Sequence, residues 1–85
     1  MRDFILYSTS ACHLCELAED ILWPVMEQQG RFMQKVDIAS DDALLETYGV
    51  RIPVLCHPDS GVELGWPFDR SQAQSFVARC SKAGG

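Results

Sequence analysis

Basic residues, long apolar runs and low-complexity segments are all scarce in this sequence. Lys and Arg together number 7 against 12 Asp and Glu, they are scattered along the 85 residues, and the net charge is −5. Because there is no basic patch, nucleic acid is not an expected partner. No apolar run approaches the roughly 20 residues of a membrane-spanning helix, so no membrane association is expected. Linkers and internal repeats are also missing, which indicates one small domain over residues 1–85.

A secretory signal is not evident either, because Met1-Arg2-Asp3 leads directly into an apolar, strand-like run. Small secreted proteins often hold their cysteines in a loop-rich disulfide framework. Here the four cysteines accompany regular strand and helix patterns, and two of them are only three positions apart. We therefore expect a reducing, cytoplasmic location.

The main motif is Cys12-His13-Leu14-Cys15, which follows a strand-like run and opens a helical pattern. The apolar positions with helical spacing are Leu14, Leu17, Ala18, Ile21 and Val25. Cys12 should therefore lie at or near a helix N-terminus, where free N–H groups and the helix dipole stabilise a thiolate. Cys15, about one turn further along, is placed to attack a mixed disulfide on Cys12. The spacing predicts a reversible dithiol–disulfide couple.

Two other interpretations of the cysteine pair remain open. The pair could be half of a structural zinc site, but such a site usually needs a second pair at similar spacing. Cys56 and His57 are adjacent, so in a strand they would point to opposite faces, and Cys80 stands alone. The pair could also be inert.

The remaining sequence alternates between strand and helix patterns. We expect strands at residues 3–8, 32–38, 53–57 and 62–66, and helices at 12–29, 41–49 and 69–80. The strand at 32–38 has the alternation of an edge strand, and residues 81–85 should form a frayed tail.

Local signals predict where the helices begin and end. Gly30 and Gly49 should end the first two helices, and Pro24 should kink the first or end it early. Ser40 is the expected N-cap of the second helix. Asp69 should cap the third, with Gln72 in the capping-box position, and the apolar spacing of that helix makes Cys80 a core residue.

The element order β-α-β-α-β-β-α predicts an α/β fold with a four-stranded mixed sheet and helices on both faces. With the cysteine motif at the first helix and Ile52-Pro53 opening the third strand, the chain resembles the thioredoxin fold in its minimal, glutaredoxin-like form. The segment 48–55 is similar to the one that carries a cis-proline in that family. Cys-His-Leu-Cys and Trp-Pro-Phe-Asp also resemble motifs of small bacterial glutaredoxin-like proteins.

The resemblance implies a thiol–disulfide oxidoreductase acting in cell redox homeostasis. Cys12 would be the nucleophile and Cys15 the resolving thiol. Pro53 would be cis beside them and would expose the Ile52 backbone to an extended substrate. A monomer without a tightly bound cofactor is expected. Its partners would be protein or small-molecule disulfides, with glutathione or a thioredoxin-type reductase as the source of thiols.

Two alternatives to this function are a thioredoxin-fold binding module without redox turnover, and a metal or iron–sulfur carrier using the cysteine pair. The sequence also departs from typical glutaredoxins. His13-Leu14 replaces a Pro-Tyr pair, Thr9 replaces a lysine, and residues 65–69 replace a Gly-Gly and acidic motif. Glutathione as co-substrate stays an open alternative, in which Arg51 would meet a glutathione carboxylate and Asp69 the amine.

Two further residues have alternative roles. His13, if protonated, would stabilise the Cys12 thiolate; otherwise it points into solvent. Trp66, with Pro67 and Phe68, could form an exposed docking surface for a substrate or a hydrophobic plug beneath the last helix.

Overall fold

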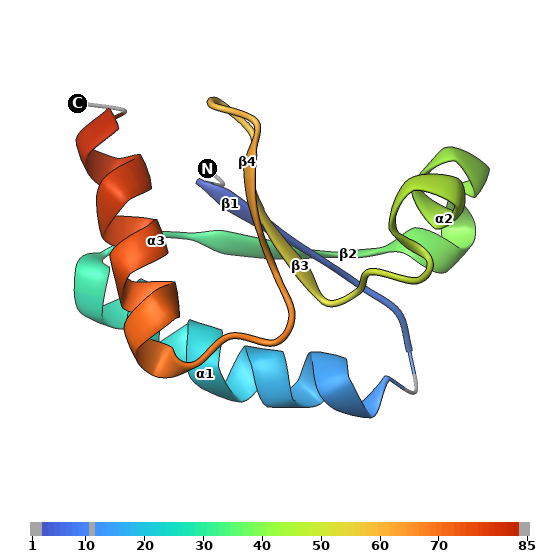
Figure 1. The fold of residues 1–85 in the computed structure, drawn as a ribbon, viewed down its shortest axis with the longest axis horizontal. Coiled ribbons are helices and arrows are strands. Elements are labelled where there is room, and N and C mark those ends of the chain that lie inside the picture. Colours follow the sequence, from blue (N-terminus) through green and yellow to red (C-terminus); the bar gives the residue numbers. More distant parts are fainter. Residues whose placement is uncertain (1–2, 11, 84–85) are drawn as a thin grey trace.

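The computed structural model describes residues 3–10 and 12–83, and its sheet has the strand order β2-β1-β3-β4 (Figure 1). The strands are β1 (Phe4–Ser8), β2 (Met33–Asp37), β3 (Val54–His57) and β4 (Val62–Gly65), and the helices are α1 (His13–Gln29), α2 (Asp42–Tyr48) and α3 (Arg70–Ala83). β1 pairs parallel with β2, whereas β3 is antiparallel to both β1 and β4. The predicted mixed sheet is confirmed, with β2 at an edge. A short 3-10 helix, η1 (Ile38–Ser40), precedes α2.

The two faces of the sheet are covered by different helices. Alternate side chains of β1 and β3, including Phe4, Leu6 and Leu55, pack with α1 and α3 in the main core. Tyr7 and Val54 point to the other face, where they join a smaller cluster with η1 and α2. Helices therefore lie on both faces, as predicted, and α2 lies beyond the end of the sheet opposite α3 (Figure 1).

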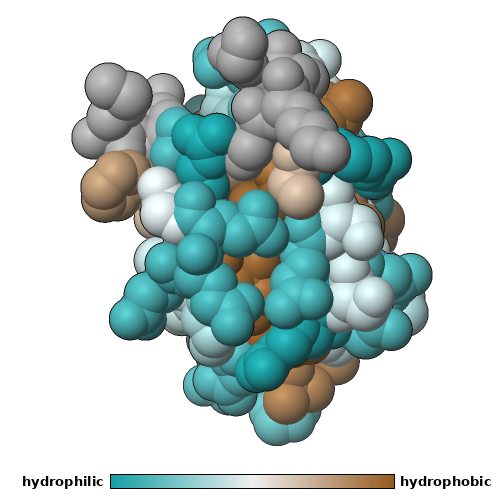
Figure 2. All heavy atoms as spheres, turned by 90° about the vertical axis from the view of Figure 1, so that its left-hand side faces the viewer, coloured by the Kyte–Doolittle hydropathy of each residue, from teal (hydrophilic) through white to brown (hydrophobic). Residues whose placement is uncertain are grey.

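On the face seen in Figure 2, hydrophilic side chains predominate, with a strip of hydrophobic atoms between them and further hydrophobic patches toward the edges of the view. Among the described residues, no helix has the length and apolar character needed to cross a membrane.

Of the two outcomes predicted at Pro24, a kink or an early end of α1, the early end is wrong. The proline lies inside a helix that continues to Gln29. Leu22, Val25 and Met26, which flank it, are at most 1% exposed. A proline costs a helix about 3 kcal/mol, but burying each of these side chains contributes roughly 1.5–3 kcal/mol, so packing keeps the second half helical. Gly30, with a φ of 65°, ends the helix as predicted.

The N-cap of α2 is Asp41 rather than Ser40. The Asp41 carboxylate accepts hydrogen bonds from the backbone N–H groups of Ala43 and Leu44, at 2.9 and 3.2 Å. Ser40 belongs to η1, where its hydroxyl donates to the carbonyl of Asp37. Ser40 and Asp41 are both residue types that can cap a helix. Because Ser40 is part of η1, Asp41 caps α2.

α3 begins with the predicted capping box and ends later than predicted. The Gln72 N–H donates to the Asp69 carboxylate at 2.8 Å, and the Asp69 N–H donates to the Gln72 side chain at 2.9 Å. The helix continues to Ala83, so residues 81–83 are not a frayed tail; no glycine or proline precedes Gly84 to stop it. Residues 84–85 lie outside the described part. Cys80 is buried, as expected.

Replacing Asp69 by alanine should lower the free energy of unfolding by about 1 kcal/mol, because the first turn of α3 loses its side-chain cap. Urea unfolding followed by circular dichroism measures the change. Asp20→Ala is the matched control, since Asp20 is exposed within α1 and its replacement should change stability by less than about 0.5 kcal/mol. Equal losses in the two variants would contradict the capping role.

Candidate active site

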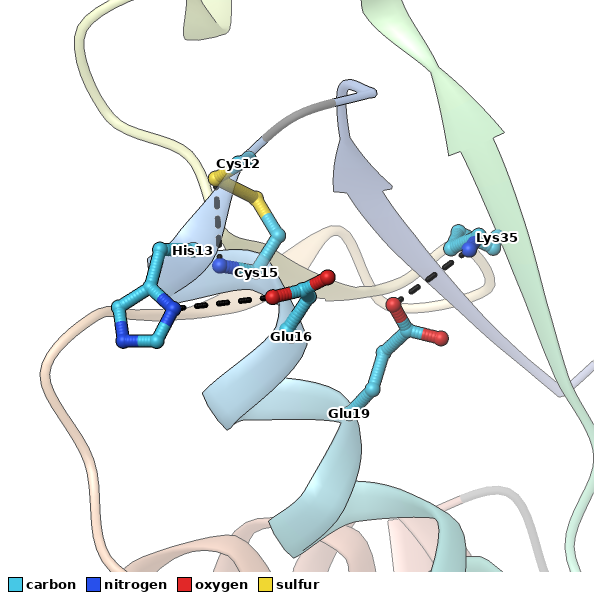
Figure 3. Close-up of a disulfide and its surroundings, with 6 residues drawn as sticks. All are labelled: Cys12, His13, Cys15, Glu16, Glu19 and Lys35. Atoms are coloured by element: carbon cyan, nitrogen blue, oxygen red, sulfur yellow. Dashed lines mark hydrogen bonds and ion pairs between the residues drawn. A yellow bond between two sulfur atoms is a disulfide. The ribbon is translucent and has the colours of Figure 1, made fainter.

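The two motif cysteines form a disulfide at the start of α1 (Figure 3). Their Cα atoms are 5.2 Å apart. Cys12 is the N-cap of α1, and its sulfur accepts the backbone N–H of Cys15 at 3.2 Å. Cys12 is half-buried, whereas Cys15 is only 2% exposed. The predicted position of Cys12 at a helix N-terminus is confirmed, and in the reduced protein this N–H group and the helix dipole favour a thiolate on Cys12.

His13 lies beside a carboxylate and not against the sulfur atoms. Its Nδ1 is 3.6 Å from Oε2 of Glu16, and the side chains of the two residues are 80% and 74% exposed. In Figure 3 the imidazole is directed away from the disulfide. Its role in stabilising the Cys12 thiolate stays a prediction.

Two of the apolar positions in the helical pattern do not face the core. Leu14 and Leu17 are 46% and 39% exposed, whereas Ala18 and Val25 are fully buried. Leu14 lies between the two cysteines in the sequence, so the disulfide has exposed apolar surface beside it. The helical spacing of apolar residues alone does not distinguish the exposed Leu14 and Leu17 from the buried residues of α1.

The α2–β3 loop carries Pro53, and its ribbon passes Cys12 in the view of Figure 3. The Ile52–Pro53 peptide bond is cis, Pro53 is buried, and Ile52 packs against the smaller core cluster. The Pro53 carbonyl accepts the backbone N–H of Trp66 at 3.2 Å, and the Ile52 N–H donates to the Tyr48 carbonyl at 3.1 Å. The loop is thereby joined to both α2 and the end of β4.

Glu63 on β4 is a member of this region that sequence reasoning missed. One carboxylate oxygen is 2.8 Å from Nη2 of Arg51, and the other accepts the hydroxyl of Tyr48. The Arg51 guanidinium also lies over the Tyr48 ring, which stacks on Tyr7. The Tyr48 hydrogen bond, followed by Arg51, lowers the pKa of the Glu63 carboxyl. An acidic residue on an exposed edge strand has no sequence signal that reveals these partners.

The segment after β4 contributes more to packing than to exposed surface. Phe68 is 5% exposed and lies in the main core, and half-buried Trp66 packs edge-on against it with ring centroids 5.1 Å apart. These contacts are those of a hydrophobic plug. Asp69 is engaged as the cap of α3, and its contact with a glutathione amine stays a prediction.

The other two cysteines are free and buried. Burial raises the pKa of both thiols, and the nearby Glu63 carboxylate raises that of Cys56 further.

His57 has its ring 5.1 Å from that of Phe4 and its Nδ1 2.7 Å from the Ser60 hydroxyl. Within the described ranges, no three His, Cys, Asp or Glu side chains gather where they could hold a metal ion.

Comparison with known proteins identifies the family. The glutaredoxin-like domain family (DUF836) matches residues 3–78. The chain belongs to this glutaredoxin-like family. No match was found among curated proteins.

Solved structures extend the comparison to the fold of this glutaredoxin-like chain. It is similar to the protein XcR50 from X. campestris, with 36% identity, a TM-score of 0.79, and coverage of 89% of this chain and 96% of that one. It also shares its fold with protein Ne2328 from Nitrosomonas europaea, at 24% identity and a TM-score of 0.73 over 88% and 89% of the two chains. Thioredoxin 1 from Thermosipho africanus has 11% identity and a TM-score of 0.71 over 99% and 98% of the chains. The predicted thioredoxin-type fold is confirmed.

In the reduced protein at pH 7, iodoacetamide should alkylate Cys12 at least about tenfold faster than Cys56 or Cys80, because alkylation needs an accessible thiolate. Cys12 accepts the Cys15 N–H, whereas burial raises the pKa of the other two thiols. Peptide mass mapping over time measures each rate, and all four cysteines should react together in urea. Comparable rates at Cys12 and Cys80 in the folded protein would contradict this assignment.

Proposed function

We propose that this glutaredoxin-like protein is a thiol–disulfide oxidoreductase that uses Cys12 and Cys15. The observation that carries the proposal is the position of Cys12 as N-cap of α1, with its sulfur both bonded to Cys15 and accepting the Cys15 N–H. A helix N-terminus lowers the pKa of a thiol, and the thiolate is the species that attacks a disulfide. An inert structural pair does not require this placement.

The reaction proceeds in two exchanges. The Cys12 thiolate attacks one sulfur of a substrate disulfide, a mixed disulfide forms, and the first substrate thiolate leaves. Cys15 then loses its proton and attacks the Cys12 sulfur, which releases the second substrate thiolate and closes the Cys12–Cys15 disulfide. The protein loses two electrons, and the substrate gains them with two protons as two thiols.

The α2–β3 loop, which carries Pro53, supplies the part of the proposed site that does not belong to α1. Because the Ile52 N–H is bonded to Tyr48, the Ile52 carbonyl is the group that receives an N–H from an extended substrate. Leu14, exposed beside the disulfide, offers apolar contact to the same substrate. A cytoplasmic thiol system, either glutathione or a thioredoxin-type reductase, then returns the pair to the dithiol.

Cys15→Ser should trap the first exchange. With hydroxyethyl disulfide, this variant should carry one mercaptoethanol unit on Cys12, stable until dithiothreitol is added, because no resolving thiol remains. Intact-protein mass spectrometry measures the adduct. Cys12→Ser should form none, since Cys15 is buried. An adduct on Cys12→Ser, or none on Cys15→Ser, would contradict the assigned roles.

The Cys12–Cys15 pair should have a reduction potential between roughly −270 and −120 mV, the range of thioredoxin-like catalysts. Equilibration in glutathione redox buffers, followed by counting of free thiols, measures it. Cys56→Ser and Cys80→Ser should leave the potential unchanged. A pair that stays reduced throughout this range is not a working redox couple.

A further inference from the structure

Three of the basic side chains that the structure describes are paired with carboxylates, and the first of them, His13, is a cation only when it is protonated. One comes from α1, one from β2 and one from the α2–β3 loop. The three pairs are His13 with Glu16 at 3.6 Å, Lys35 with Glu19 at 3.4 Å, and Arg51 with Glu63 at 2.8 Å. Figure 3 shows the first two pairs below the disulfide.

The Arg51 pair is the shortest and is supported by a third residue. Glu63 also accepts the Tyr48 hydroxyl, and the Arg51 guanidinium lies 5.3 Å from the centre of the Tyr48 ring. These contacts keep Glu63 ionised at neutral pH, since they lower the pKa of its carboxyl. Because a carboxylate of the protein itself neutralises the Arg51 guanidinium, its attraction for a substrate carboxylate is weakened.

The basic residues elsewhere in the described part do not offset the negative charge. Arg31 lies 3.9 Å from Asp3, Arg70 directly follows Asp69, and Arg79 is near Cys80 in the second half of α3. The whole chain carries a net charge of −5. A substrate with negative groups therefore approaches a chain whose net charge has the same sign, which slows association and weakens binding.

We infer that the redox site accepts neutral and cationic disulfides and rejects anionic ones, and that Glu63 enforces this choice by neutralising the charge of Arg51. The inference rests on the proposed oxidoreductase function. It places oxidised glutathione, which carries carboxylates, among the poor substrates. It favours disulfides in neutral or basic surroundings, since discrimination can come from repulsion of the wrong partner.

Three small symmetric disulfides test the inference. They are cystamine (cationic), hydroxyethyl disulfide (neutral) and dithiodipropionate (anionic). Each oxidises the reduced protein to the Cys12–Cys15 disulfide and is itself converted to two thiols. The loss of protein thiols, followed by quenching and mass spectrometry, gives a second-order rate constant. The three disulfides also differ in the intrinsic reactivity of their leaving thiols. To correct for this, each rate constant is divided by the rate constant of dithiothreitol with the same disulfide, which gives the corrected rate.

The corrected rates should fall from cystamine to hydroxyethyl disulfide to dithiodipropionate. We expect at least about a tenfold span at low ionic strength, and it should shrink as salt is added. Glu63→Gln should raise the corrected rate for dithiodipropionate about fivefold or more. The matched control is Glu27→Gln, with the same charge change at the far end of α1, and it should raise that rate less than about twofold.

A second variant separates a freed arginine from a general change in charge. Glu63→Gln combined with Arg51→Gln should lose the gain toward dithiodipropionate, because no cation remains to be released. Thermal unfolding and the reduction potential are measured for every variant, so that a misfolded protein or an altered dithiol is recognised. A gain that survives in the double variant would overturn the role of Arg51.

The outcomes distinguish the inference from the proposed function. If none of the three disulfides oxidises the wild-type pair, the oxidoreductase proposal fails. If all three react with equal corrected rates, or the anionic one reacts fastest, the oxidoreductase stands and the charge preference is overturned. If Glu63→Gln behaves like Glu27→Gln, the assignment to Glu63 is wrong.

Discussion

The hydrogen bond from the Cys15 N–H to the Cys12 sulfur connects the fold to its chemistry. It exists because α1 begins at Cys12, and α1 is held there by the burial of Ala18, Leu22 and Val25 against the sheet. The free N–H groups of a helix start need acceptors, and here a sulfur atom meets that need. The same packing that stabilises α1 thus places a backbone N–H donor and the helix N-terminus beside the Cys12 sulfur.

A second constraint acts on the opposite side of the site. The loop before β3 is attached to β4 twice, through the bond from the Trp66 N–H to the Pro53 carbonyl and through Glu63, which binds Arg51 and Tyr48. β4 is an edge strand with a mainly exposed surface. Its contribution to the core is small, but it determines where the loop lies. The candidate site therefore depends on two elements, α1 and β4, rather than on one motif.

The parts of this arrangement that the sequence predicts are those governed by local signals. Cys12 as a helix start, Gly30 as a stop and the Asp69–Gln72 box each depend on residues within a few positions. Predictions failed where distant packing or a neighbouring turn decided the outcome, as with an early end of α1 at Pro24 and a cap at Ser40. Glu63 was missed because its partners come from another element, and the register of the β3–β4 hairpin brings them together only in the folded chain.

The paired charges are not readily explained by stability. Exposed ion pairs contribute about 0–1 kcal/mol, and the His13–Glu16 pair is almost fully solvated. Their larger effect is on charge, because Glu19 and Glu63 each neutralise a cation, Lys35 and Arg51, that would otherwise attract an anion. In the proposed function, Arg51 is the cation next to Ile52-Pro53 that would attract a substrate carboxylate, and it is already paired with Glu63. The proposed charge preference thus depends on β4, whereas the cysteine pair belongs to the start of α1.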